Sequence, residues 1–402
     1  MRPSGHVPLT VGGEVRSAAD AVARAKSPRF RAAYVHVPFC RHKCHYCDFY
    51  SFVDDQDRGE AFVRRLEEEL AAAGSFLREP LETVFVGGGT PTMLPPVLLE
   101  RMLRAIRREL PLRPDVEWTV EANPETVSEE IAATLVACGV TRVSLGAQSF
   151  DPALLAALER HHDPASVPRA VARLRSAGIR ELNLDLIFGI PGSTLVQWRE
   201  DLSRAIDLGP DHLSAYGLVY EPNTPLTVKL RKGMVTRLDE EIEAEQSIHA
   251  VDALAEAGYA RYEISNWAKP GCECQHNLLY WENADWWAFG PSGSAHADGV
   301  RWKNVPRLSD WLEDGPFSPV QDVECLGEDT RAGEAFMLGL RLMRGIGRSR
   351  VTELLAMGER GGERAQAIKR HETTGLLVWR DDRLQLTARG LMVADSVLAE
   401  LV

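Results

Sequence analysis

Residues 34–51 read YVHVPFCRHKCHYCDFYS and place Cys40, Cys44 and Cys47 directly after an alternating apolar run. The run Tyr34–Pro38 predicts a β-strand, so the three cysteines should lie in the loop beyond its carboxyl end. Thiolates with this C-x3-C-x2-C spacing suit an iron–sulfur cluster, although three is one ligand fewer than a closed site takes. A Cys3His zinc site remains the alternative, because three histidines also lie in or beside this loop.

Outward from this stretch, the chain alternates between short β-rich runs and segments with helical periodicity. The β-rich runs are Tyr34–Pro38, Thr83–Val86, Glu117–Glu121, Thr141–Leu145, Leu182–Ile187 and His212–Val219. The helical segments between them include residues 60–74, 97–110, 166–178 and 194–209. Six strands alternating with helices predict an α/β fold with a parallel sheet, arranged as an open or partial barrel. In such folds functional side chains lie at the carboxyl ends of the strands.

The pattern divides the chain into four predicted parts. Residues 1–33 are small and polar without clear periodicity, which indicates a flexible arm. Residues 34–222 form the barrel, and residues 223–308 form an extension of it with an aromatic, glycine-rich stretch. Residues 309–402 combine helices with a hairpin that turns at Asp381–Asp382. This combination predicts a small winged-helix-like cap domain.

Composition narrows the class of partners. The 402 residues contain 46 Lys plus Arg against 58 Asp plus Glu, a net charge of −12. Such a balance argues against a broad nucleic-acid or anionic-membrane surface, because phosphate binding needs positive charge. No apolar run is long enough for a membrane span, and the first residues lack the apolar core of a secretory signal. Seven cysteines, an odd number, do not indicate a disulfide framework, so we expect a cytoplasmic protein.

Polar residues and glycines follow the other predicted strands. Residues 87–90 read GGGT after the second run, and glycine lets a backbone come close to a ligand. Glu121 ends the third run, Gln148 lies just beyond the fourth, and Asp185 lies near the end of the fifth. Two carboxylates and an amide at one barrel mouth suit a ligand that carries hydroxyls and an ammonium group.

Four motifs together carry a resemblance to a known family. YVHVPFCRHKCHYCDF, GGGTPT, GAQSF and LDLIFGIPG resemble the radical S-adenosylmethionine (SAM) superfamily, and within it the branch that contains oxygen-independent coproporphyrinogen dehydrogenase and the heme chaperone HemW. The resemblance covers nearly the whole chain from Tyr34 onward and implies a partial (β/α)6 barrel. It also implies a [4Fe-4S] cluster on Cys40, Cys44 and Cys47, with SAM on the fourth iron. The SAM contacts that it implies are Tyr34, Tyr46, Gly88, Gly89, Thr90, Glu121, Gln148, Arg160 and Asp185.

Two functions within this branch remain open from the sequence. The first is a chaperone that binds heme and delivers it to haemoproteins of the respiratory chain. The second is a dehydrogenase that oxidatively decarboxylates coproporphyrinogen III. Phe49 favours the chaperone, because the dehydrogenase typically carries a further cysteine at that position. The sequence assigns no catalytic residue and leaves open whether SAM is cleaved and whether the chain forms a homodimer.

A second motif also favours the chaperone. The segment HNLLYW matches the H-N-x-x-Y-W pattern associated with heme binding in that branch. An imidazole can ligate heme iron, and aromatic rings can cover a flat macrocycle. The heme contacts implied are His276, Asn277, Tyr280 and Trp281. An ordinary turn whose aromatics fill the barrel mouth is the alternative, and Cys272 and Cys274, just before the motif, have no assigned role.

Overall fold

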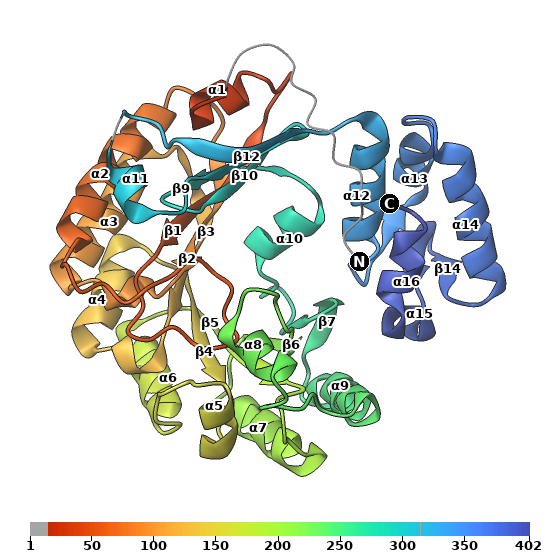
Figure 1. The fold of residues 1–402 in the computed structure, drawn as a ribbon, viewed down its shortest axis with the longest axis horizontal. Coiled ribbons are helices and arrows are strands. Elements are labelled where there is room, and N and C mark those ends of the chain that lie inside the picture. The colour runs from red at the N-terminus through yellow and green to blue at the C-terminus, as the bar shows by residue number, and fades with distance from the viewer. Residues whose placement is uncertain (1–14, 314) are drawn as a thin grey trace. The chain divides into compact units, whose positions relative to one another are not determined.

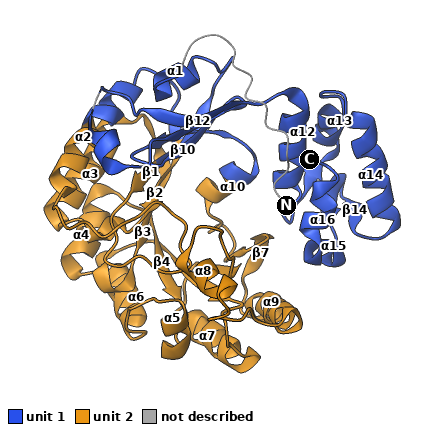
Figure 2. Cartoon of the chain, in the orientation of Figure 1, with its two compact units in different colours: residues 1–34, 68–81, 279–402 blue, residues 35–67, 82–278 orange. Residues whose placement is uncertain are grey.

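The computed structural model describes residues 15–313 and 315–402. The chain divides into two compact units, which Figure 2 distinguishes by colour. The first unit comprises residues 1–34, 68–81 and 279–402, and the second comprises residues 35–67 and 82–278. This division differs from the four consecutive parts expected from the sequence, because each unit collects segments that lie far apart in the chain.

The second unit contains the βα alternation. Its strands are β1 (Phe30–Val37), β2 (Leu81–Gly88), β3 (Leu112–Ala122), β4 (Arg142–Gln148), β5 (Glu181–Phe188), β6 (His212–Gly217), β7 (Ala260–Glu263) and β8 (Asn266–Ala268), of which β1 and β2 begin in the first unit. Its helices are α3 (Pro96–Glu109), α4 (Glu129–Cys138), α5 (Pro152–Ala157), α6 (Ser166–Ala177), α7 (Leu195–Asp207), α8 (Pro225–Arg231) and α9 (Glu240–Glu256). The helices α2 (Gly59–Ala73) and α10 (Gln275–Trp281) cross from one unit to the other.

The strands of this unit form an open barrel. They follow the order β1-β2-β3-β4-β5-β6-β8-β7, and the pairs from β3 to β6 are parallel. The pairs β6–β8 and β7–β8 are antiparallel, and β7 ends the order, so the barrel does not close. Figure 1 shows α3, α4, α6 and α7 along the outside of the strands. The predicted partial barrel is confirmed; its first five strands are slightly longer than the sequence indicated, and β6 ends two residues earlier than predicted.

Alternation along β5 explains how one strand serves both the core and the barrel interior. Successive side chains of a strand point to opposite faces. Leu182, Leu184 and Leu186 are fully buried on one face. Asn183 and Asp185 lie on the other face, where they are hydrogen-bonded to each other at 2.8 Å. The apolar face holds the strand in the core, and the polar face is left for the chemistry of the barrel interior.

The first unit holds the remaining elements. These are α1 (Ala18–Val22), β9 (Asp285–Phe289), β10 (Ser294–Ala297), β11 (Val300–Asn304), α11 (Leu308–Glu313), β12 (Val320–Cys325), α12 (Glu328–Gly339), β13 (Ile346–Gly347), α13 (Arg348–Leu355), α14 (Gly361–Thr373), β14 (Leu377–Arg380), β15 (Arg383–Leu386), α15 (Ala388–Met392) and α16 (Ala394–Ala399). Strands β9 to β12 pair antiparallel. Strands β13, β15 and β14 form a separate three-stranded sheet among the last helices.

Two sequence expectations fall in this unit. The hairpin β14–β15 turns at Asp381 and Asp382, whose φ angles of 48° and 60° are those of a tight two-residue hairpin turn. The segment expected to be a flexible arm contains α1 and the start of β1 at Phe30, while residues 1–14 lie outside the described residues. None of the helices in the described ranges is both long and apolar enough to cross a membrane.

Candidate functional site

A cavity of about 420 Å³ opens at the carboxyl ends of the strands in the second unit. All three clustered cysteines line it. So do the expected SAM contacts of this unit, namely Tyr46, Gly88, Gly89, Thr90, Glu121, Gln148, Arg160 and Asp185. The structure therefore brings together residues that are spread over about 145 positions of the sequence. Tyr34 belongs to the first unit and stays a prediction.

The glycine turn after β2 fixes the start of the cysteine loop. Gly88 has a φ of +99°, which favours glycine, and the N–H of Gly89 donates to the carbonyl of Val37 at 2.7 Å. A Cβ atom at Gly89 would lie 2.6 Å from the carbonyl oxygen of Phe39, so no larger residue fits without a shift. This close approach leaves the Thr90 hydroxyl 3.6 Å from the Cys40 sulfur.

Arg160 supplies a positive charge beside the cysteines. Its guanidinium lies 3.4 Å from the Cys44 sulfur and donates to the carbonyl of Gly146 at 3.1 Å. Its Nε donates to Nδ1 of His162 at 3.2 Å, which requires that ring nitrogen to be unprotonated. Burial lowers the pKa of His162 to about 4, in agreement with a neutral ring. A guanidinium here offsets the negative charge of thiolate ligands.

Two carboxyl groups supply negative charge on the strand side of the cavity. Glu121 accepts from the N–H of Gly88 at 2.9 Å, and Asp185 accepts from Ser144 and Asn183, each at 2.8 Å. Burial, followed by the neighbouring Asp185, raises the pKa of Glu121 to about 7. Burial also raises the pKa of Asp185. Two partly buried carboxyl groups favour a ligand with a positive charge, because ionised carboxylates are costly to remove from water without one.

The sequence did not identify several residues that line the same cavity. Ser144 lies on β4, and its side chain donates to Asp185. It is two residues before Gly146 on the same strand, so its side chain lies on the same face, and this spacing could have indicated its place in the cavity. Val219 was not identified either; with Phe49, which was already noted from the sequence, it lines the cavity, and the two side chains are 62% and 59% exposed. A second cavity of about 360 Å³ shares Cys44 and other lining residues with the first. The full lining of this second cavity is Arg41, His42, Cys44, Thr90, Asn123, Glu125, Arg160, His161 and His162.

The HNLLYW segment forms most of α10, and its first three residues belong to the second unit. His276 is only 1% exposed, its Nδ1 lies 2.8 Å from the Thr83 hydroxyl, and its ring packs 5.2 Å from that of Phe85. Burial lowers the pKa of His276 to about 3. The imidazole is therefore a packed, hydrogen-bonded group. Tyr280 and Trp281 belong to the first unit, and their predicted role is not tested.

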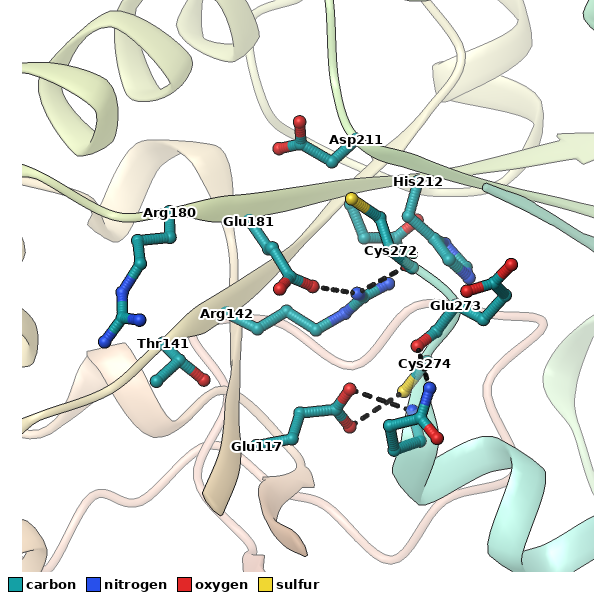
Figure 3. A network of polar contacts seen from close by, with 12 residues as sticks. Glu117, Thr141, Arg142, Arg180, Glu181, Asp211, His212, Cys272, Glu273 and Cys274 are labelled. Atoms are coloured by element: carbon teal, nitrogen blue, oxygen red, sulfur yellow. Dashed lines mark hydrogen bonds and ion pairs between the residues drawn. The ribbon is translucent and has the colours of Figure 1, made fainter. Parts of the chain in front are cut away.

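A polar network holds the start of this segment (Figure 3). The Glu117 carboxylate accepts from the N–H groups of Gln275 at 2.8 Å and His276 at 2.9 Å, and the Cys274 thiol donates to it at 3.6 Å. Arg142, the first residue of β4, donates to the Cys272 carbonyl at 3.0 Å. It also donates to Glu181, the first residue of β5, at 2.8 Å. Cys272 and Cys274 thus lie near the amino ends of these strands, whereas the clustered cysteines lie at the carboxyl ends.

Comparisons with known proteins agree with this geometry. Residues 34–205 match the radical SAM superfamily. The chain is 40% identical to the heme chaperone HemW of Mycobacterium tuberculosis over 376 residues, which is 92% of this chain and 94% of that protein. It is 32% identical to the heme chaperone HemW of Bacillus subtilis over 372 residues, which is 91% of this chain and 98% of that protein. The chain belongs to the HemW family.

A solved structure gives the same fold. It is that of the coproporphyrinogen III oxidase HemN from Escherichia coli, described as a radical SAM enzyme, and it matches with a TM-score of 0.81. The match covers 96% of this chain and 94% of that chain at 20% identity. An identity this low shows the shared fold alone, so it does not choose between the functions of the two families.

Membership of the HemW family, and so of the radical SAM superfamily, implies a [4Fe-4S] cluster and SAM rather than zinc. The residues present fit both groups. Three thiols line one cavity beside the guanidinium of Arg160, and two carboxyl groups line the strand side. Among the described residues, Cys40, Cys44 and Cys47 are the cysteines that line the cavity, so one iron of a bound cluster would keep a position for a small ligand.

Proposed function

We propose that this HemW family member is a heme chaperone, which binds heme and delivers it to haemoproteins of the respiratory chain. The observation that carries the proposal is the 40% identity to a curated HemW over nearly the whole of both chains. Phe49 supports it, because this residue lines the cavity where the dehydrogenase typically carries a cysteine. All seven cysteines are free, which suits a reducing cytoplasm.

In this proposal the cavity holds the cluster and SAM. Cys40, Cys44 and Cys47 would ligate three irons, and Glu121 and Asp185 would hold the charged and hydroxyl-bearing parts of SAM. A bound cluster supplies electrons at low potential. The glycine turn at the end of β2 packs tightly on the start of the cysteine loop, so it would hold that loop in place around the cluster.

The four proposed heme contacts do not all suit the same role. His276 does not fit an iron ligand as it stands, because its ring is buried and bonded to Thr83. Iron could reach it only after the ring is uncovered. Asn277, Tyr280 and Trp281 remain proposed contacts, with His276 holding the segment in place. Heme titrations of His276→Ala, followed by the Soret band, test this assignment.

The test of the function uses the full chain with its cluster reconstituted under anaerobic conditions. The protein is loaded with heme and mixed with a haemoprotein apoprotein, and transfer is followed by the Soret shift. In parallel, the reduced protein is incubated with SAM and coproporphyrinogen III. We expect heme transfer and no decarboxylated porphyrinogen. Formation of protoporphyrinogen, or a failure to bind heme, would overturn the proposal.

A further inference from the structure

A continuous chain of hydrogen bonds runs through the second unit from the cavity to the HNLLYW segment. Its members, in order, are Asp185, Asn183, His212, Tyr262 and Asn277. The four successive donor–acceptor distances are 2.8, 2.7, 2.9 and 3.1 Å. Asn183 and His212 are only 4% and 2% exposed. Water therefore has little access to the bond between Asn183 and His212 at the centre of the chain.

The direction of the chain is fixed from its cavity end. An ionised carboxylate only accepts, so Asn183 turns its amide nitrogen toward Asp185. The same nitrogen donates to the Ser144 hydroxyl at 2.7 Å, and that hydroxyl donates to Asp185. The carbonyl oxygen of Asn183 therefore faces His212 and accepts the proton of Nδ1. The amide nitrogen and the carbonyl oxygen of the Asn183 side chain are thus both hydrogen-bonded.

The remaining orientations follow from this one. With its proton on Nδ1, His212 accepts at Nε2 from the Tyr262 hydroxyl. The hydroxyl oxygen then accepts from the amide nitrogen of Asn277, which also donates to Glu263 at 3.2 Å. Burial holds the pKa of His212 well below its usual value, so the ring stays neutral as this arrangement requires. Each member has one orientation that satisfies both neighbours.

The far end of the chain lies in the first turn of α10. The backbone of that turn is held separately by Glu117, which accepts from two of its N–H groups (Figure 3). A displacement of this turn would break the bond between Asn277 and Tyr262. A displacement of Asp185 would release the amide of Asn183. Because Asn183 and His212 are buried and each is bonded on both of its polar sides, the loss of a bond at one end weakens the orientation of the next group in the chain.

We propose that Asn183, His212 and Tyr262 are positioning residues that couple the SAM cavity to the HNLLYW segment. This inference rests on the proposed function, which places SAM at one end and heme at the other. A ligand that fixes Asp185 stabilises the orientation of Asn277, and a ligand that holds α10 stabilises Asp185. Each ligand then changes the affinity for the other by the same factor.

The variant Tyr262→Phe tests the coupling, because it removes one hydroxyl and keeps the ring. Its matched control is Tyr259→Phe. The Tyr259 hydroxyl is also buried and donates to the carbonyl of Pro210 at 2.7 Å, outside the chain. Both variants are prepared with the cluster reconstituted. SAM affinity is measured by calorimetry, and the spectrum of the reduced cluster is recorded with and without SAM.

We expect Tyr262→Phe to weaken SAM binding about fivefold, the usual effect of one lost buried hydrogen bond, and Tyr259→Phe to leave it within about twofold. SAM affinity equal to that of the native protein in Tyr262→Phe would overturn the inference. An equal loss in both variants would also overturn it, since that would be the general effect of a missing hydroxyl. This comparison needs no heme, so it stands even if heme binding fails.

The second measurement is the heme dissociation constant with and without SAM. We expect SAM to change it at least about fivefold in the native protein and in Tyr259→Phe, and to leave it unchanged in Tyr262→Phe. If the heme dissociation constant of the native protein does not change with SAM, the coupling is overturned and the proposed function is not. A native protein that binds no heme overturns the proposed function, and the calorimetry then decides whether the chain positions Asp185.

Discussion

Glu121 combines burial, one hydrogen bond and a neighbouring carboxyl group at the floor of the cavity. Its pKa of about 7 means that the ligand-free protein holds a proton there over much of the acidic range. A cationic ligand such as SAM favours the ionised form, so binding releases that proton below pH 7. The affinity for SAM should therefore rise with pH up to about 7 and then level off.

The pH dependence can be measured by calorimetry. With a pKa of about 7, the ionised fraction of Glu121 grows about tenfold from pH 6 to pH 8, so we expect SAM affinity to rise by about the same factor. Glu121→Gln cannot titrate and should bind SAM more weakly with a flat profile over this range. If the SAM affinity of Glu121→Gln rises with pH as steeply as that of the native protein, the titrating group is not Glu121.

At the scale of one element, α10 depends on a carboxylate from a distant strand. Glu117 accepts from two N–H groups that the helix itself leaves unpaired at its amino end. Glu117→Gln removes the charge and keeps the shape, so we expect unfolding to cost about 1–2 kcal/mol less in this variant. Amide exchange at Gln275 and His276 should accelerate, because their N–H groups lose the stronger acceptor.

The matched control for this prediction is Glu273→Gln. Glu273 is a partly exposed carboxylate in the same loop, and it offers the same loss of charge away from the helix N–H groups. Exchange at Gln275 and His276 that stays at the native rate in Glu117→Gln would show that the helix start is held by packing. Equal acceleration in both variants would assign the effect to net charge in the loop.

The elements differ in how far the sequence could predict them. The strands of the barrel were predictable, because alternation along a run such as β5 is local information. The cysteine loop and the strand-end residues were predictable as a site, since parallel strands bring their carboxyl ends together. The polar chain was not predictable. Asn183 lies 29 residues from His212, and His212 lies 50 residues from Tyr262, with no motif to join them.

The burial of His276 was also beyond the sequence. A histidine in a motif associated with heme suggests an exposed ligand, whereas the fold packs this ring against Phe85 and bonds it to Thr83. Both partners lie almost 200 residues upstream on β2. Sequence pattern gives the chemical type of a side chain, but tertiary packing decides whether it can reach a ligand.

At the scale of the whole molecule, the net charge of −12 acts on any anionic ligand. Heme carries two propionates, so long-range repulsion should slow its approach at low ionic strength. Screening shortens the reach of that repulsion from about 30 Å at 0.01 M salt to about 8 Å at 0.15 M. We expect the association rate of heme to rise about two- to fivefold over this range, measured by stopped-flow absorption in the Soret band.

A cationic porphyrin provides the control, because the same field attracts it and added salt should slow its association. The opposite result for heme would point to Arg41 and Arg160, which line the second cavity beside the cysteines. Heme association that slows with added salt would mean that this local positive potential guides the ligand against the overall charge. It would then place the entry of heme at the carboxyl ends of the strands rather than at the HNLLYW segment.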